Sequence, residues 1–213
     1  MFLLAATANT IGKEAIDVCM ELEALIRQKR RIRAIGFDDA PFVRHQVAKV
    51  NISGIVCSNT RFEGMVWGEV EADGQDATDT ICQLLIGKKF LPQLHLIMLD
   101  GIGFGGFNLV DLPALAHRLQ LPCVAVMRKL PNITKMKQAM SRLPNYQQRA
   151  ISLEKAGKIH AYAPFFFQVC GERPEIIAQA LAQLTDRGKV PEALRLAHLI
   201  GAAVVSGESS SQA

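Results

Sequence analysis

The chain has 213 residues, enough for one hydrophobic core of ordinary size, and this length argues against a second large domain. Hydrophobic residues make up 49% of the chain, charged residues 21% and aromatic residues 6%, which indicates a globular protein with an aliphatic core. The net charge of +4 is too small to indicate nucleic-acid binding by itself, so the distribution of charge matters more than its sum.

The first predicted element is an amphipathic helix over residues 12–30, which we assign to an N-terminal segment, 1–32, that precedes the core. Its apolar residues recur at helical spacing, with acidic residues early and basic residues late. A basic cluster ends the helix, and Arg30 and Arg31 within it precede Asp38 closely in sequence. These cations either offset the helix dipole or hold a polyanion beside Asp38. On the second interpretation, Arg30 and Arg31 bind substrate.

Three extended runs follow, over residues 33–37, 46–58 and 61–72, rich in Val and Ile and joined by short polar turns. Their spacing predicts an antiparallel meander. A helical pattern then starts at a plausible cap, Asp76, and the chain alternates between a strand over 94–99, a helix over 109–119, a strand over 122–127 and a helix from 133. The short, nearly continuous apolar strands indicate parallel pairing with both faces covered.

Beyond residue 144 the sequence predicts a helix to 156, a strand over 165–169, and helices over 174–184 and 191–205. Residues 207–213 form a polar tail that we expect to be disordered. Three antiparallel strands followed by parallel βαβ units are the order of a ribonuclease-H-like fold. The sequence therefore predicts an α/β protein with a three-layer, ribonuclease-H-like domain over residues 33–206 and a mixed sheet.

Two of the predicted strands end in aspartates. The strand that ends at Asp38 and Asp39 and the strand that ends at Asp100 are both aliphatic. If these strands are adjacent and parallel, Asp38 and Asp100 stand side by side at the sheet edge where ligands of open α/β sheets bind. A hard divalent cation, Mg²⁺ or Mn²⁺, would remove the repulsion between the two carboxylates and would be held by them together with water and phosphate oxygens.

A second ion would need a third acid, and the candidates on the third strand and its exit turn are Asp73, Asp76, Glu69 and Glu71. We choose Asp73 because it falls at the junction of strand and helix. Taken singly, each of the aspartates is explained as well by a turn or a helix cap. Two aspartates at the ends of two apolar strands are harder to explain in that way, because aspartate is a poor strand former.

A competing motif occupies residues 101–106, where the sequence Gly-Ile-Gly-Phe-Gly-Gly contains G-x-G-x-x-G between a strand and a helix. This pattern is typical of dinucleotide binding, and Arg128, about 20 residues later, could meet a 2′-phosphate. Against it, the carboxylate of Asp100 would face a pyrophosphate, and antiparallel strands do not suit a doubly wound sheet. A Rossmann-type nucleotide-cofactor enzyme is therefore an alternative hypothesis.

His198 lies on the last predicted helix, where it could position a water molecule or a phosphate, although a histidine on an aliphatic helix is more often a packed residue. The sequence has no paired Cys and His clusters, which argues against zinc. The five cysteines are odd in number and scattered, so we expect reduced thiols in a cytoplasmic protein. The apolar opening MFLLAATA is too short to span a bilayer and lacks a basic flank, so we expect no membrane anchor.

Several segments together resemble the endonuclease dU family, which is similar in sequence pattern to endonuclease V. The resemblance runs from residue 33 to 208. The matching segments are IGFDDAPF at 35–42, DGQDAT at 73–78, MLDG at 98–101 through GGFN at 105–108, VAVMR at 124–128, and residues 191–198. The resemblance implies a ribonuclease-H-like fold and metal-dependent cleavage of DNA near a deaminated base, such as uracil or hypoxanthine, in DNA repair.

Endonuclease V has an Asp-Glu-Asp metal set, a lysine after its fifth strand and a histidine near its C-terminus. By position, the resemblance places these roles on Asp38, Asp73, Asp100, Arg128 and His198. The sequence departs from the pattern in having Asp as the middle acid and Arg for the Lys, and it contains no Pro-Tyr-Ile-Pro wedge. We also expect substrate contacts from Gly101, Gly103 and Lys129. A non-catalytic nucleic-acid-binding protein of the same fold is the remaining alternative.

Overall fold

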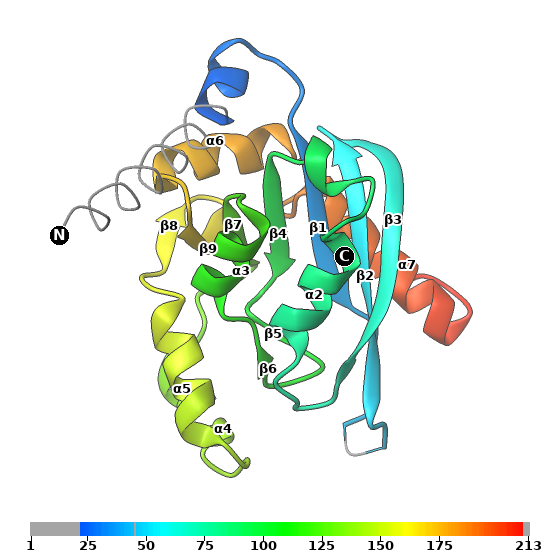
Figure 1. The fold of residues 1–213 in the computed structure, drawn as a ribbon, viewed down its shortest axis with the longest axis vertical. Coiled ribbons are helices and arrows are strands. Elements are labelled where there is room, and N and C mark those ends of the chain that lie inside the picture. Colours follow the sequence, from blue (N-terminus) through cyan, green and yellow to red (C-terminus); the bar gives the residue numbers. More distant parts are fainter. Residues whose placement is uncertain (1–21, 45, 211–213) are drawn as a thin grey trace, which may run out of the picture.

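A seven-stranded mixed sheet forms the centre of the protein (Figure 1). The computed structural model describes residues 22–44 and 46–210. In sheet order the strands are β3 (Arg61–Glu71), β2 (Lys49–Ser58), β1 (Arg33–Asp39), β4 (Leu96–Asp100), β7 (Cys123–Met127), β9 (Phe165–Cys170) and β8 (His160–Tyr162). Strands β3, β2 and β1 form the predicted antiparallel meander, and β1, β4 and β7 run parallel.

The last two strands of the sheet differ from the prediction. Strand β9, which the sequence predicts, pairs antiparallel with β7, and the short edge strand β8 beside it was not predicted. Only Ala163 and Pro164 separate β8 from β9, so the chain reverses direction in a hairpin before it reaches β7. A parallel connection would need a much longer crossover.

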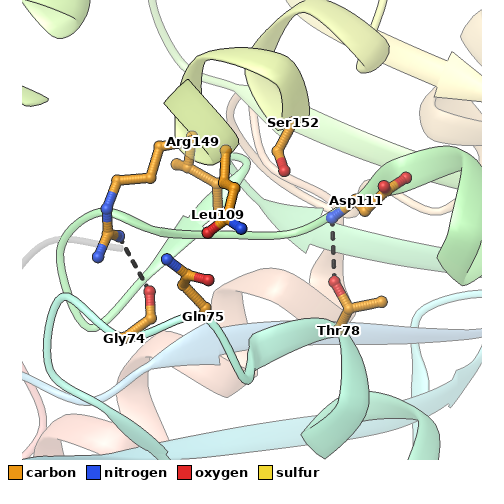
Figure 2. Close-up of a pocket in the computed structure, with 8 residues that line it drawn as sticks. Gly74, Gln75, Thr78, Leu109, Asp111, Arg149 and Ser152 are labelled. Atoms are coloured by element: carbon orange, nitrogen blue, oxygen red, sulfur yellow. Dashed lines mark hydrogen bonds between the residues drawn. The ribbon is translucent and has the colours of Figure 1, made fainter. Parts of the chain in front are cut away.

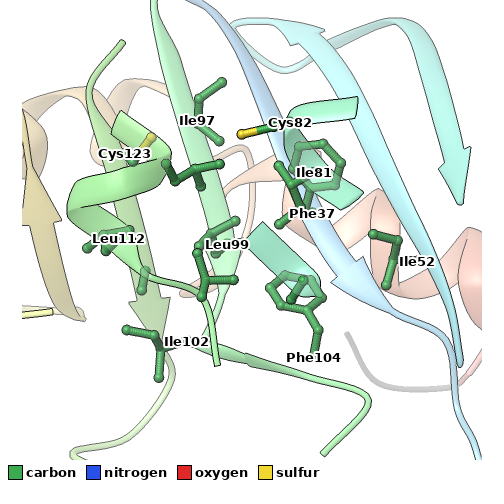
Figure 3. Packing of buried hydrophobic residues seen from close by; sticks show 14 of the residues in the cluster. Phe37, Ile52, Ile81, Cys82, Ile97, Leu99, Ile102, Phe104, Leu112 and Cys123 are labelled. Carbon is green, nitrogen blue, oxygen red and sulfur yellow. The ribbon is translucent and has the colours of Figure 1, made fainter. Parts of the chain in front are cut away.

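Helices cover both faces of the sheet and complete the predicted three-layer architecture. Helices α2 (Ala77–Leu85) and α3 (Leu112–Leu119) cover one face, and α6 (Pro174–Gln183) and α7 (Glu192–Ser206) cover the other. Successive side chains of a strand point to opposite faces, so β1 contributes Ile35 and Phe37 to the first core and Ala34 to the second. Figure 3 shows Phe37 and Leu99 packed with residues of α2 and α3. The α/β, ribonuclease-H-like prediction is confirmed.

The glycine-rich stretch does not form a dinucleotide-binding turn. Gly103 belongs to the short strand β5 (Gly103–Phe104), which pairs antiparallel with β6 (Asn108–Leu109) in a hairpin. Helix α3 begins only after this hairpin, at Asp111, whose carboxylate caps it by accepting a hydrogen bond from the backbone N–H of Ala114. No helix N-terminus therefore follows the glycines directly, and the geometric basis of the Rossmann-type alternative is wrong.

Helix α7 lies very close to β1 because β1 has a glycine at the contact. A Cβ atom built on Gly36 would stand 2.7 Å from the backbone nitrogen of Leu194, closer than real Cβ contacts allow. The glycine thus lets the helix backbone rest directly on the strand. This close approach carries the middle of α7 over the end of β1, where Asp38 lies.

The remaining elements are the 3₁₀ turn η1 (Leu91–Gln93) and the helices α4 (Ile133–Met140) and α5 (Tyr146–Lys155). Residues 22–27 are helical, whereas most of the helix predicted over 12–30, with Cys19, lies outside the described residues. Residues 207–210 follow α7 without helix or strand, and the disorder of the tail stays a prediction. The cysteines at 57, 82, 123 and 170 are free, and the first three are buried. Within the described residues no helix is long and apolar enough to cross a membrane.

Candidate metal centre

Asp38 and Asp100 meet at the edge of the sheet, as the sequence predicts. Phe37 of β1 pairs with Leu99 of β4 in parallel register, so the aspartates that follow them stand at the same level near the ends of their strands. His198 joins the two aspartates, and one ligand atom from each of the three residues lies within 4.8 Å of the others. Asp38 is only 5% exposed, whereas Asp100 and His198 are half-buried and reachable from solvent.

Helix α7 brings His198 to Asp38, with the imidazole Nδ1 2.9 Å from the carboxylate Oδ2. Burial raises the pKa of Asp38 to about 7, against the opposing effect of this hydrogen bond, and the negative charge of Asp100 raises it further. The hydrogen bond to Asp38 in turn raises the pKa of His198. Both shifts favour the protonated forms, so the pair holds a proton that a bound cation would displace.

Asp39, the last residue of β1, supports the site from the position next to Asp38. Its Oδ2 accepts a hydrogen bond from the backbone N–H of Gly105 at 2.7 Å, which ties the β5–β6 hairpin to the end of β1. Burial raises the pKa of Asp39, although the hydrogen bond from Gly105 acts in the opposite direction. Gly105 has a positive φ of 55°, and a glycine adopts this conformation without strain.

Arg128 stands at the same edge, where β7 ends. Its Nη2 lies 3.0 Å from Asp100 Oδ2, so the guanidinium balances part of the negative charge of the cluster. Lys129 follows it on the exposed chain that leaves β7. Gly101 and Gly103, the other predicted substrate contacts at this edge, line a pocket of about 250 Å³ beside the aspartate. The structure therefore brings all four residues to the edge that holds Asp100.

Asp73, predicted as the third acid, is not part of the cluster. Its Oδ1 accepts hydrogen bonds from the backbone N–H of Phe107 at 2.7 Å and from Arg44 at 3.3 Å. The residue itself has a positive φ of 49°. Asp73 thus uses its carboxylate to hold the turn after β3 against the β5–β6 hairpin. Asp38, Asp100 and His198 remain as the candidate ligand set.

Arg30 and Arg31, predicted to bind substrate beside the aspartates, lie at the wrong end of the sheet. Strand β1 starts at Arg33, and Asp38 stands near its other end. A strand advances about 3.3 Å per residue, so roughly 20 Å separates these arginines from the cluster. These arginines are close to Asp38 in sequence, but the extended strand between them and Asp38 keeps them far from it in space.

One buried cation near the site was not predicted. Arg149 of α5 is 4% exposed, and its guanidinium donates to the backbone carbonyls of Asp73, Gly74, Phe107 and Pro144. Figure 2 shows the arginine reaching the Gly74 carbonyl beside a pocket of about 110 Å³. Burial lowers its pKa. Nothing in the local sequence distinguishes this arginine from an exposed one, because three of its four partners come from two loops that are distant in sequence.

The residues of the cluster fit a divalent metal ion. Two carboxylates and one imidazole are donors that Mg²⁺ or Mn²⁺ accepts, and no cysteine belongs to the group. Asp38 and Asp100 would repel each other when both are ionised, and burial makes ionised Asp38 costly. A cation bound to both carboxylates would offset the repulsion and the cost of burial together. Within residues 22–44 and 46–210, this is the one group of three or more His, Cys, Asp or Glu side chains that is placed to hold a metal ion.

A family model and two related proteins match most of this chain. The model of the family described as endonuclease dU matches residues 30–205. A UPF0215 protein of Methanothermobacter thermautotrophicus is 38% identical over 190 residues, which cover 87% of this chain and 93% of that protein. A UPF0215 protein of Deinococcus radiodurans is 36% identical over 184 residues, covering 86% of this chain and 94% of the relative.

Solved structures give the same result at the level of the fold. A protein of unknown function from Archaeoglobus fulgidus has a TM-score of 0.77 at 34% identity, covering 81% of this chain and 98% of its own. The catalytic domain of human endonuclease V has a TM-score of 0.55 at 17% identity, covering 93% and 97%. Ciona intestinalis endonuclease V, solved with a 24mer DNA containing an inosine followed by a ribo-adenosine, has a TM-score of 0.54 at 15% identity, covering 92% and 99%. The chain therefore belongs to the endonuclease dU family and shares its fold with endonuclease V.

Proposed function

We propose that this protein is a metal-dependent endonuclease that cleaves DNA containing deaminated bases. The observation that carries the proposal is the meeting of Asp38, Asp100 and His198 at the carboxyl edge of the two central parallel strands. Membership of the endonuclease dU family supports nuclease activity. The inosine-containing DNA bound to an endonuclease V of the same fold supports the substrate class.

In this proposal Asp38 and Asp100 would hold the divalent ion, and His198 would act beside them. A divalent ion at such a site supplies Lewis acidity toward a phosphate oxygen and lowers the pKa of a bound water molecule. The contact between His198 Nδ1 and Asp38 fixes the orientation of the imidazole, which leaves Nε2 to exchange a proton with the attacking water or the leaving oxygen. Arg128, already against Asp100, stabilises the negative charge that develops on the phosphate.

The pocket of about 250 Å³ beside Asp100 supports recognition of a base that has left the stack. Its lining is mainly apolar, and Gln168, which is 3% exposed, supplies a buried amide. Such a pocket can stack a flat base and hydrogen-bond its edge, which is how enzymes read an extruded base. The lining residues are Gly101, Ile102, Gly103, Gly106, Phe107, Leu109, Met127, Pro131, Ile133, Met136, Leu153 and Gln168.

The test is cleavage of labelled oligonucleotides that carry uracil, hypoxanthine or no lesion, with Mg²⁺, with Mn²⁺ and with EDTA. We expect metal-dependent cleavage near the deaminated base by the wild type. Removing a metal ligand removes charge stabilisation in the transition state, so Asp38→Asn should lower the rate by at least about 100-fold. Asp79→Asn, which changes an exposed carboxylate on α2, is the matched control and should keep the wild-type rate.

Cleavage that persists in EDTA or in Asp38→Asn would contradict the proposed mechanism. Equal cleavage of all three oligonucleotides would leave a nuclease but overturn the preference for deaminated bases. Binding of the oligonucleotides without any cleavage would instead support the alternative of a non-catalytic nucleic-acid-binding protein. Cleavage is read from denaturing gels and binding from native gels of the same reactions, so one set of samples separates the three cases.

A further inference from the structure

Helices α4 and α5 form a helical hairpin that projects from the body of the protein at the end of the sheet where β1 and β4 terminate (Figure 1). The chain enters this hairpin directly from Arg128 at the end of β7 and returns to the sheet at β8. We call residues 128–158 the basic arm. Its first residue contacts Asp100, so the arm is continuous with the candidate metal centre.

The basic arm carries a strong excess of positive charge. It contains eight lysines and arginines and a single acidic residue, Glu154. Four of these cations are engaged: Arg128 with Asp100, Lys137 with Glu154, Lys155 with Asp111, and Arg149 with backbone carbonyls. The other four are exposed and have no ion-pair partner among the described residues. They are Lys129, Lys135, Arg142 and Lys158.

The arm is fixed to the body rather than freely hinged. Met140 of α4 and Leu153 of α5 are buried in the same core as β1 and β4. Arg149 donates to the carbonyls of Asp73 and Phe107, which lie in the turn after β3 and in the β5–β6 hairpin, and this hairpin is hydrogen-bonded to Asp39 at the end of β1. The four free cations are therefore held in a set position relative to Asp100, which lowers the entropic cost of binding a partner there.

We propose that the basic arm binds the sugar-phosphate backbone of nucleic acid next to the phosphate that is cut. This inference rests on the proposed nuclease function and names the surface that would hold its substrate. Exposed cations without acidic partners on an arm that begins at the catalytic edge match a polymer with one phosphate per nucleotide. The +4 net charge of the whole chain does not reveal this surface, because the acidic residues lie elsewhere.

The test compares two variants that remove the same charge from different places. The arm variant is Lys129→Gln, Lys135→Gln, Arg142→Gln and Lys158→Gln. The matched control is Arg27→Gln, Lys29→Gln, Arg30→Gln and Arg31→Gln, which removes four exposed cations from the opposite end of β1. Binding of a fluorescent DNA duplex is measured by anisotropy in EDTA, where metal-dependent cleavage cannot occur, at several salt concentrations.

We expect the arm variant to raise the Kd by at least about tenfold and to reduce the slope of log K against log salt by roughly 0.9 for each lost phosphate contact. The control variant should change both quantities much less. A Lys129→Arg, Lys135→Arg and Lys158→Arg variant keeps the charge and should bind like the wild type. None of these side chains is buried, so we expect every variant to fold, and a thermal midpoint measured for each one checks this.

Equal losses in the arm variant and the control would overturn the inference, because binding would then follow total charge. Unchanged binding by the arm variant would also overturn it, and wild-type cleavage in parallel samples with Mg²⁺ or Mn²⁺ in place of EDTA would show that the proposed function stands. A wild type that neither binds nor cuts the oligonucleotides would refute the proposed function itself. Displacement of the duplex by poly-glutamate at equal charge concentration would instead identify acidic protein as the partner.

Discussion

Burial and neighbouring negative charges both raise the pKa of Asp38. It is almost fully buried, and burial raises its pKa to about 7, with the charges of Asp100 and Asp39 adding to the shift. A neutral acid would be a poor metal ligand, so below about pH 7 binding of a cation would release the proton from Asp38. The site therefore couples metal binding to pH.

The same shifts predict how the stability of the metal-free protein depends on pH. The pKa values of Asp38 and His198 are both raised on folding, so the folded state binds more protons than the unfolded state. Their contribution to stability is full below the unfolded pKa of an aspartate and is lost as the pH rises through about 7. In EDTA, we expect the free energy of unfolding from urea titrations to fall by at least about 1 kcal/mol between pH 5 and pH 8.

Asp38→Asn is the control for this prediction, because asparagine does not titrate and also frees His198 from its charged partner. The variant should lose most of the decline between pH 5 and pH 8. A decline of the same size in the wild type and in Asp38→Asn would show that other groups cause it.

Arg149 offers a prediction about the support of the site. Replacing it with methionine removes the donor from four backbone carbonyls, three of which lie in the turn after β3 and in the β5–β6 hairpin. Unsatisfied buried acceptors are costly, so we expect Arg149→Met to lower the free energy of unfolding by about 2–4 kcal/mol in urea titrations. Arg142→Met, an exposed position on the same hairpin, should change it by less than about 0.5 kcal/mol. Equal effects at the two positions would refute the anchoring role.

The sequence predicts the placement of a side chain best where that placement follows from a strand end. Asp38 and Asp100 could be placed together because each follows an aliphatic run, and the parallel register of two adjacent strands brings the ends of these runs to the same level. Arg149 could not be found, because its partners are backbone carbonyls of distant loops. Asp73 was assigned to the cluster from its place at a strand-to-helix junction, but the turn directs its carboxylate toward the backbone N–H of Phe107.

At the scale of elements, the contact between β1 and α7 connects the fold to the site. Gly36 lets the helix backbone lie on the strand, and the same helix carries His198 to Asp38. The sequence of α7 is rich in aliphatic residues and predicts a helix. Nothing in the sequence shows which strand this helix will contact. The pairing of His198 with Asp38 therefore depends on packing between segments that are distant in sequence.

We expect Gly36→Ala to move α7 away from β1, because the new Cβ would stand 2.7 Å from Leu194 N and 2.8 Å from Ala193 C. Overpacking of this kind costs about 1–3 kcal/mol of stability, and the contact between His198 and Asp38 should weaken with it. Gly201→Ala, on α7 itself, is the graded control, since its Cβ would meet Ala40 at 3.3 Å. Chemical denaturation of both variants should show the larger loss in Gly36→Ala, and a larger loss in Gly201→Ala would contradict this account.

The elements themselves were predictable to different degrees. Periodicity predicts the meander, the parallel strands and the amphipathic helices, because each of these buries a regular set of apolar residues. The β5–β6 hairpin escaped prediction because its strands have two residues each and the turn between them is rich in glycine. Helix α2 begins after Asp76 as expected, but the side chain of Asn108 caps it by accepting from the N–H of Ala77.

At the scale of the whole molecule, the functional features share one end of the sheet. The candidate metal centre, the pocket beside Gly101 and the start of the basic arm all follow the carboxyl ends of β1, β4 and β7. Ligands of open α/β sheets bind at this end, so the fold places a phosphate, an extruded base and the flanking backbone next to one another. The opposite end carries a second basic cluster that includes Arg30 and Arg31, which the proposed function does not use.

The central claim is that Asp38 and Asp100 bind one divalent ion together, and titration calorimetry with Mn²⁺ tests it most directly. We expect the wild type to bind Mn²⁺, and Asp38→Asn and Asp100→Asn each to weaken binding by at least about tenfold, because each removes a charged ligand. Asp73→Asn should bind like the wild type, since Asp73 lies outside the cluster. Failure of the wild type to bind Mn²⁺ at millimolar concentration, or unchanged binding by Asp38→Asn and Asp100→Asn, would contradict the claim.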